Sequence, residues 1–224
     1  MAILRTGAFG TFENEQEIER LISENPELLV ADGATPPVLV ARHLILPDCT
    51  LDCFLLDVTS IPIVVESTLA KFDNGRRGVV AQAIDSISAL AALTVVQLDE
   101  AAGGAVERAL WTFAGDDSGD FGRRRTSLAE NLRAARVKFI VALDELNPSM
   151  DRQIRFLAEH SHLDVQCVAI AKSRPSPPPA MRLLGLAASS HKTVAPDRHA
   201  SAAHEFMRRG TRPIDHLERV QWDG

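Results

Sequence analysis

Apolar residues dominate two neighbouring segments in the first third of the chain, residues 51–58 and 61–68. Their length and their aliphatic, β-branched composition predict two strands, and the short polar break between them predicts a turn that joins the strands into a β-hairpin. With the turn centred on the first residue of the break, Asp52 and Glu66 face each other on one side of the hairpin. With the turn centred just after it, Glu66 faces Cys53 instead.

The two acids in this hairpin are candidate metal ligands. Paired side chains on adjacent strands have Cβ atoms about 5 Å apart. Two carboxylates at that spacing, on strands this apolar, repel each other and resist the loss of water. A divalent cation is the usual physical reason for keeping Asp52 and Glu66 in such an arrangement. The alternative is that either acid lies at a strand end and points into water.

The rest of the chain mixes helical and strand-like segments, which predicts an α/β fold with a central mixed β-sheet flanked by helices. Asn14 is expected to cap the first helix, and Thr126 or Ser127 a later one. The polar, glycine-rich segment 115–122 is expected to be a solvated loop. The predicted helices are 12–24, 76–93, 126–136 and one beginning at Asn147-Pro148; the predicted strands outside the hairpin are 38–46, 107–114, 137–143 and 165–171, and residues 94–98 are either a short strand or a helix extension.

The 224 residues suffice for one sizeable core with an appendage. We expect a folded domain over residues 1–172, followed by a proline-rich linker over 173–179. Few apolar positions recur beyond the linker. The C-terminal tail, 180–224, is therefore expected to be loosely structured, with short helices around 202–209 and 214–220.

The helix predicted over 76–93 has a second face of small residues with one long amide at its centre. The row comprises Gly75, Gly78, Gln82, Ser86 and Ala89. Small residues let a ligand or another backbone approach closely, but tight packing against the sheet explains the glycines and the alanine equally well. The amide of the glutamine needs a polar partner if it is buried.

Charge limits the ways in which the chain could bind nucleic acid. Lys and Arg number 24 against 30 Asp and Glu, a net charge of −6, whereas non-specific nucleic-acid binders are more often basic. Contact with DNA or RNA would therefore require a local basic patch. Each candidate cluster, taken alone, is better explained as a solvated face; the clusters are Arg76-Arg77, Arg123-Arg124-Arg125, and Arg133 with Arg136.

The three cysteines, Cys49, Cys53 and Cys167, form no CxxC pair and are expected to be buried thiols in a reducing compartment. No apolar run has the length of a membrane span, and the first residues lack the apolar core of a signal peptide. We therefore expect a cytoplasmic protein that does not contact a membrane. A homodimer is left open.

Several segments together carry a resemblance to a known superfamily. The order is a helix ending in Asn25-Pro-Glu-Leu-Leu29, a strand with Leu51-Asp52, a strand with Glu66-Ser-Thr-Leu69, and a helix that opens with Arg76-Arg-Gly-Val-Val-Ala-Gln82. This order resembles the PD-(D/E)xK nuclease superfamily, and most closely a prokaryotic group of restriction-endonuclease-like proteins. Phe139-Ile-Val-Ala-Leu-Asp144 and Ile154-Arg-Phe-Leu157 are similar to the second half of that group. The resemblance covers roughly residues 12–172 and implies a restriction-endonuclease-like core.

Carried over by position, the resemblance makes Asp52 and Glu66 metal-binding carboxylates for Mg²⁺ or Mn²⁺. Glu15 matches an acid on the first helix that completes the metal site in some members. Gln82 matches a helix glutamine near the site. The neighbouring Arg76 and Arg77 lie where contact with a nucleic-acid phosphate is expected.

The chain departs from the superfamily pattern at a central position. Thr68 stands where the motif has the lysine that orients the attacking water and offsets charge on the phosphate. Threonine donates one hydrogen bond and carries no charge. Lys71 is the nearest replacement along the sequence. Ser86 also replaces an aromatic residue that usually follows the helix glutamine.

Three functions remain open from the sequence. The first is metal-dependent hydrolysis of phosphodiester bonds in DNA or RNA, in which Lys71 or Arg77 supplies the missing positive charge. The second is a nuclease-fold protein that has lost catalysis and binds nucleic acid or another protein, which Thr68 and Ser86 favour. The third is an unrelated enzyme that uses histidines. His160, His162, His199 and His204 are the candidates, and none has a supporting carboxylate at ligand spacing.

Overall fold

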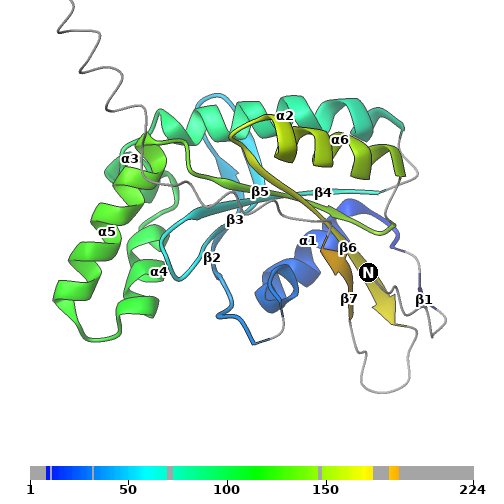
Figure 1. The fold of residues 1–224 in the computed structure, drawn as a ribbon. Coiled ribbons are helices and arrows are strands. Elements are labelled where there is room, and N and C mark those ends of the chain that lie inside the picture. The colour runs from blue at the N-terminus through cyan, green and yellow to red at the C-terminus, as the bar shows by residue number, and fades with distance from the viewer. Residues whose placement is uncertain are drawn as a thin grey trace, which may run out of the picture. The chain divides into compact units, whose positions relative to one another are not determined.

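One mixed β-sheet lies at the centre of the described part of the chain (Figure 1). Three strands form an antiparallel meander, and two later strands run parallel to its last strand. In spatial order the strands are β2 (Val38–Ile45), β3 (Thr50–Leu56), β4 (Pro62–Thr68), β5 (Lys138–Leu143) and β6 (Asp164–Ser173). The short strands β1 (Phe9–Gly10) and β7 (Arg182–Leu186) both pair antiparallel with β6.

This computed structural model describes residues 9–10, 12–31, 33–69, 73–145, 148–173 and 182–186, with side chains described for 12–31, 33–69, 78–145 and 148–170. All of these residues belong to the first of two compact units, Met1–Ser190; the second is His191–Gly224. The helices expected in the tail, and most of the proline-rich linker, lie outside the described residues. Residues 182–186, inside the range expected to be a loose tail, form strand β7.

Helices cover both faces of the sheet. Helix α1 and the 3₁₀-helix η1 lie on one face, and α2 and α6 on the other (Figure 1). Three further helices follow α2 and pack near β2, β3 and β4. The bounds are α1 (Glu15–Glu24), η1 (Pro26–Leu29), α2 (Asp73–Ala91), α3 (Val95–Ala101), α4 (Ala105–Ala114), α5 (Ser118–Arg133) and α6 (Pro148–His160). The predicted α/β architecture with a helix-flanked mixed sheet is confirmed.

Alternation along the β3–β4 hairpin divides the core into two layers. Cys53, Leu55 and Val65 pack into the layer beneath α1, whereas Phe54 and Val64 belong to the larger layer that the other helices cover. Side chains alternate across a strand because successive Cβ atoms point to opposite faces. Asp52 and Glu66 therefore share the strand parity of the larger layer.

A single aspartate organises the turn of this hairpin. Asp57 Oδ1 accepts hydrogen bonds from the backbone N–H of Thr59 at 2.8 Å, from the Thr59 hydroxyl at 2.7 Å and from the backbone N–H of Ile61 at 2.9 Å. Ser60 adopts the left-handed region, with φ of 62°, and its N–H donates to the Asp57 carbonyl. Side chains of Asp mimic a backbone turn in this way, so Asp57 fixes the position of the turn and with it the strand register.

The predicted first helix and its cap are confirmed. Asn14 is the N-cap of α1, and its side chain accepts a hydrogen bond from the backbone N–H of Glu17. Ile18 and Ile22 form the buried stripe. The Glu17 carboxylate accepts from the backbone N–H of Glu13, so it does not complete the capping box through Asn14.

Two predictions between β4 and β5 are wrong. Residues predicted as a strand over 107–114 form α4, whose buried Val106, Ala109 and Leu110 recur at helical spacing. Residues 115–122 are not a loop throughout, because Asp117 caps α5. That cap starts α5 at Ser118, ahead of the predicted caps at Thr126 and Ser127.

The segment 94–98 is a helix extension and not a strand. It belongs to α3, and Thr94 forms a capping box with Gln97. Among the described residues, no single helix combines the length and apolar character needed to cross a membrane; α2 and α3 pass that test only together, as a pair bent by 115°.

Candidate active site

The β3–β4 hairpin brings Asp52 and Glu66 together. The antiparallel register runs to the pair Cys53 and Val65, so the next positions along the two strands are Asp52 and Glu66. The backbone N–H of Ser67 donates to Asp52 Oδ2 at 2.9 Å, which holds the Asp52 side chain against β4. The earlier of the two predicted turn positions is therefore confirmed, and the two acids face each other.

Glu66 is a buried acid beside a second acid. Its strand, β4, lies between β3 and β5, and the residue is 7% exposed. Burial and the neighbouring Asp52 carboxylate raise the pKa of Glu66 to about 8. The alternative that this acid points into water is wrong. A pKa raised in this way favours the protonated form of Glu66 at neutral pH, and a bound cation would take the place of that proton.

A third acid, Glu19 of α1, completes a cluster that sequence reasoning missed. The residue is 5% exposed, and its Oε2 is buried without a hydrogen bond. Arg42 Nη2 lies 3.6 Å and His43 Nε2 lies 3.3 Å from this oxygen, beyond ordinary hydrogen-bond length. Burial and Asp52 raise the pKa of Glu19, whereas His43 and Arg42 act in the opposite direction.

The predicted helix acid, Glu15, lies one turn earlier on α1. Its Oε1 accepts a hydrogen bond from the backbone N–H of Leu69 at 3.4 Å, so it reaches the end of β4. Thr68, the residue at the lysine position, is buried at the same strand end. The sequence contained a signal for Glu19. It lies four residues after Glu15, on the same face of the helix, and between Ile18 and Ile22 of the buried stripe.

The buried thiol of Cys53 shows that these charged groups converge. Burial and, after it, the carboxylates of Glu19, Asp52 and Glu66 raise the pKa of Cys53 to about 12, and Arg42 acts in the opposite direction. The thiol donates a weak hydrogen bond to the Glu19 carbonyl, with 3.8 Å between Sγ and O. Three acids and one arginine, from α1, β2, β3 and β4, are therefore close enough to one buried thiol to shift its pKa.

Other predicted site residues fall into two groups. Gln82 is exposed on α2 and, within the described side chains, forms no hydrogen bond to Asp52 or Glu66; Ser86 on the same helix is buried. Lys71 and the side chains of Arg76 and Arg77 lie outside the described residues. The roles assigned to all five stay predictions.

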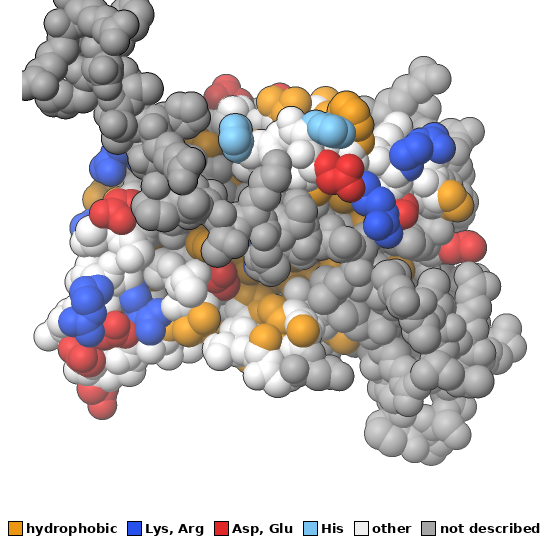
Figure 2. All heavy atoms as spheres, viewed as in Figure 1, with side chains coloured by type: hydrophobic (Ala, Val, Ile, Leu, Met, Phe, Trp, Pro, Cys, Tyr) orange, Lys and Arg blue, Asp and Glu red, His pale blue; other side chains and the backbone are white. Residues whose placement is uncertain are grey.

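The arginines of α5 form ion pairs and not a basic patch. Arg123 and Arg124 both pair with Asp120, and Arg125 pairs with Glu107. Figure 2 shows basic and acidic side chains intermingled over α4 and α5. This cluster is therefore a mixed-charge face, as its simpler explanation predicted.

The acid cluster offers hard oxygen donors, the ligand type that Mg²⁺ and Mn²⁺ prefer. Among the described residues, no three His, Cys, Asp or Glu side chains already stand in a metal-binding arrangement. Mg²⁺ is commonly held by only one or two carboxylates together with water and substrate phosphate. Asp52 and Glu66 would hold such an ion if Asp52 turned from the Ser67 N–H and Glu66 lost its proton; Glu19, whose Oε2 pairs with Arg42 and His43, lies near Asp52.

Comparisons with known proteins add no assignment. No family model matches the chain, and neither the curated proteins nor the solved structures include a significant match. Function is therefore inferred from the residues and geometry of the site.

Proposed function

We propose that this chain is a divalent-metal-dependent phosphodiesterase that cleaves DNA or RNA on a PD-(D/E)xK-type, restriction-endonuclease-like core. The order of elements supports the proposal: a helix with acids, a three-strand meander with Asp52 and Glu66 on its last two strands, a long helix, and a strand parallel to β4. The observation that carries it is the facing pair Asp52 and Glu66, in which Glu66 is buried with a pKa of about 8.

Nothing in the packing requires an acid at position 66. Its strand neighbours Val64 and Val65 are buried apolar residues, and an apolar side chain there would avoid the cost of burying a carboxyl group. A fold that keeps a buried acid facing a second, half-buried acid carries that cost for a purpose. Binding of a divalent cation offsets it, because the cation replaces the proton and screens the repulsion between the carboxylates.

Asp52 and Glu66 would hold Mg²⁺ or Mn²⁺, with Glu15 or Glu19 contributing from α1. The ion would supply charge stabilisation for the phosphate and would lower the pKa of attacking water. The Glu66 carboxyl would give up its proton on becoming a ligand. The hydroxyl of Thr68 can orient water but brings no charge, so the positive charge must come from another residue.

A binding protein that has lost catalysis is the second candidate. Thr68 favours it, because threonine carries no charge where the motif has a lysine. The described charged groups that shift the pKa of Glu66 favour it too, because both of them, Asp52 and Glu19, are acids and neither supplies a positive charge. Such a protein would keep the fold and bind nucleic acid without cutting it. The two functions differ in whether phosphodiester bonds are broken.

Thermal unfolding with and without Mn²⁺ tests the proposal. We expect Mn²⁺ to raise the Tm of wild type and not of Asp52→Asn or Glu66→Gln, since a ligand that binds only the folded state stabilises it. Glu107→Gln, which removes a surface carboxylate paired with Arg125, is the matched control and should keep the Mn²⁺ response. Cleavage of labelled DNA and RNA in Mn²⁺ should follow the same pattern across the variants. A Tm that ignores Mn²⁺ in wild type would overturn the metal site; a response without cleavage would favour the binding protein.

A further inference from the structure

Acidic side chains repel a phosphate group, so a site built on them also needs a positively charged side chain. Strand β2 supplies one. Among the described side chains, the basic residues that pair with this cluster are Arg42 and His43, both on β2 and both next to Glu19. Arg42 is the register partner of Cys53, so it lies on the α1 side of the sheet, where it pairs with Glu19. Strand β2 carried no site residue in the sequence-based predictions.

The local backbone holds this part of β2 in an unusual conformation. His43 has φ of 50°, in the left-handed region, in the middle of a strand. A register irregularity lies between Leu39 and Ala41, just before Arg42. Such conformations cost free energy and persist where the surroundings require them. Their effect here is that two consecutive residues, Arg42 and His43, both reach the same Glu19 oxygen.

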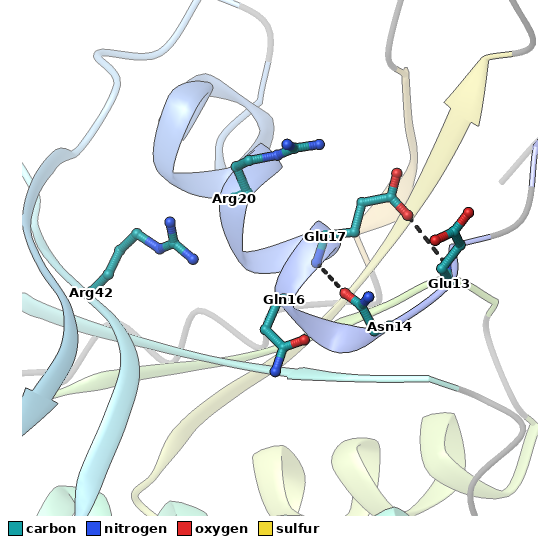
Figure 3. A pocket seen from close by; sticks show the side chains of 6 residues that line it. All are labelled: Glu13, Asn14, Gln16, Glu17, Arg20 and Arg42. Carbon is teal, nitrogen blue, oxygen red and sulfur yellow. Dashed lines mark hydrogen bonds between the residues drawn. The ribbon is translucent and has the colours of Figure 1, made fainter.

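The Arg42 guanidinium has one buried neighbour and one open side. Its contact with Glu19 Oε2, at 3.6 Å, is too long for a hydrogen bond, and the side chain is 35% exposed. The open side faces a pocket of about 380 Å³ along α1, lined also by Gln16 and Arg20 (Figure 3). Glu13, Asn14 and Glu17 complete the lining, and Figure 3 shows the two carboxylates at the opposite end from Arg42.

We propose that Arg42 contacts a backbone phosphate of the nucleic acid at the acid cluster and supplies the positive charge that Thr68 lacks. The planar guanidinium presents several N–H donors in a fork that matches two phosphate oxygens. The buried Glu19 carboxyl holds the Arg42 side chain in place, and the pocket that Arg42 lines leaves its guanidinium accessible to a phosphate. This inference rests on the proposed phosphodiesterase function and names the residue through which its substrate is held.

Two measurements on the whole chain test the role of Arg42. The first is binding of a short labelled single-stranded DNA, and of the same sequence as RNA, in Ca²⁺ across a series of salt concentrations. Each lost phosphate contact lowers the slope of log K against log salt by about one. The second is cleavage in Mn²⁺, where losing one charged contact to the reacting phosphate is expected to slow turnover by about 100-fold.

Arg42→Gln should show both losses while keeping the Mn²⁺-induced rise in Tm, since it removes no carboxylate. Arg42→Lys should retain most of the wild-type salt slope but less of the cleavage rate, because lysine keeps the positive charge and lacks the forked N–H donors of the guanidinium. The same variant provides the test if Arg42→Gln fails to fold. Arg155→Gln is the matched control, as Arg155 is an arginine of similar exposure paired with Asp151 on α6, and it should behave as wild type.

An unchanged salt slope and an unchanged cleavage rate in Arg42→Gln would overturn the role of Arg42 and leave the proposed function standing. Wild type that binds the oligonucleotide without Mn²⁺-dependent cleavage would overturn the proposed function, and the salt slope would still decide whether Arg42 contacts phosphate. Wild type that neither binds nor cleaves would overturn both.

Discussion

At the scale of single residues, Glu66 couples folding to pH. Its ordinary pKa of 4.5 rises to about 8 in the folded chain, so from about pH 4.5 to pH 8 the folded state binds more protons than the unfolded state. The stability that the protonated acid provides is present below pH 4.5 and is lost as pH rises towards 8. Glu19 acts in the same direction, because its pKa is also raised.

The metal-free protein should therefore become less stable as pH rises through this window. We expect the Glu66 contribution to the free energy of unfolding to fall by on the order of a few kcal/mol in total, as measured by chemical denaturation in chelator. Glu66→Gln should flatten most of the slope and be more stable than wild type near pH 8. A wild-type protein whose stability is level or rises over this range would show that Glu66 is not held protonated.

Ala135 is a second residue whose backbone conformation makes a prediction. It follows the C-cap of α5 with φ of 50°; its N–H donates to the Leu132 carbonyl, and the Arg136 N–H donates to the Asn131 carbonyl. These two bonds define a Schellman motif, in which glycine is preferred at the left-handed position. The alanine Cβ makes that conformation costly.

Ala135→Gly should stabilise the protein by about 1 kcal/mol in chemical denaturation. Ala134→Gly is the control, since Ala134 has an ordinary φ of −88° and gains nothing from glycine. A loss of stability in Ala135→Gly equal to that in Ala134→Gly would contradict this account of the α5 terminus.

At the scale of elements, the turn at Asp57 sets the register that creates the site. Removing its carboxylate leaves the Thr59 and Ile61 N–H groups without that acceptor. We expect Asp57→Ala to lower the free energy of unfolding by about 1–2 kcal/mol, and Asp116→Ala, in an exposed turn, to lower it much less. Equal effects of the two substitutions would mean that Asp57 does not hold the hairpin.

The hairpin could be predicted because its signals agree. Two apolar runs of strand length, a polar break and the pairing rule together determine which residues face each other. The segment between β4 and β5 could not be predicted as well. Residues 107–114 contain Trp111 and Phe113, which are common in strands, yet tertiary packing buries Val106, Ala109 and Leu110 along one helical stripe of α4. The Asp117 cap starts α5 early enough to include two glycines, Gly119 and Gly122, that suggested a loop.

The candidate site shows the same contrast. Asp52 and Glu66 follow from local pairing, whereas Glu19 and Arg42 come to them from other elements. Glu19 depends on how α1 docks against the sheet, and Arg42 on an irregular strand whose left-handed His43 no periodicity reveals. Neither the docking of a helix on the sheet nor a strained backbone conformation can be predicted from the alternation and spacing of apolar residues.

At the scale of the whole molecule, the site lies where elements from both sides of the sheet meet. Asp52 and Glu66 have the strand parity of the larger core layer, and α1 brings Glu19 from the layer on the other face. The chain as a whole carries a net charge of −6, so a nucleic acid must be attracted locally and in the presence of a divalent cation. Binding of DNA or RNA should therefore be much weaker in chelator than in Ca²⁺.

The central claim is that Asp52 and Glu66 exchange a proton for a divalent cation. Calorimetric titration of the protein with Mn²⁺ at pH 7, in two buffers of different ionisation enthalpy, counts the protons released on binding. We predict release of about one proton per ion by wild type, because its raised pKa keeps the Glu66 carboxyl protonated at pH 7. Glu66→Gln, which lacks this ligand, should give no Mn²⁺ binding signal. Absence of Mn²⁺ binding in wild type, or binding without proton release, would contradict this account.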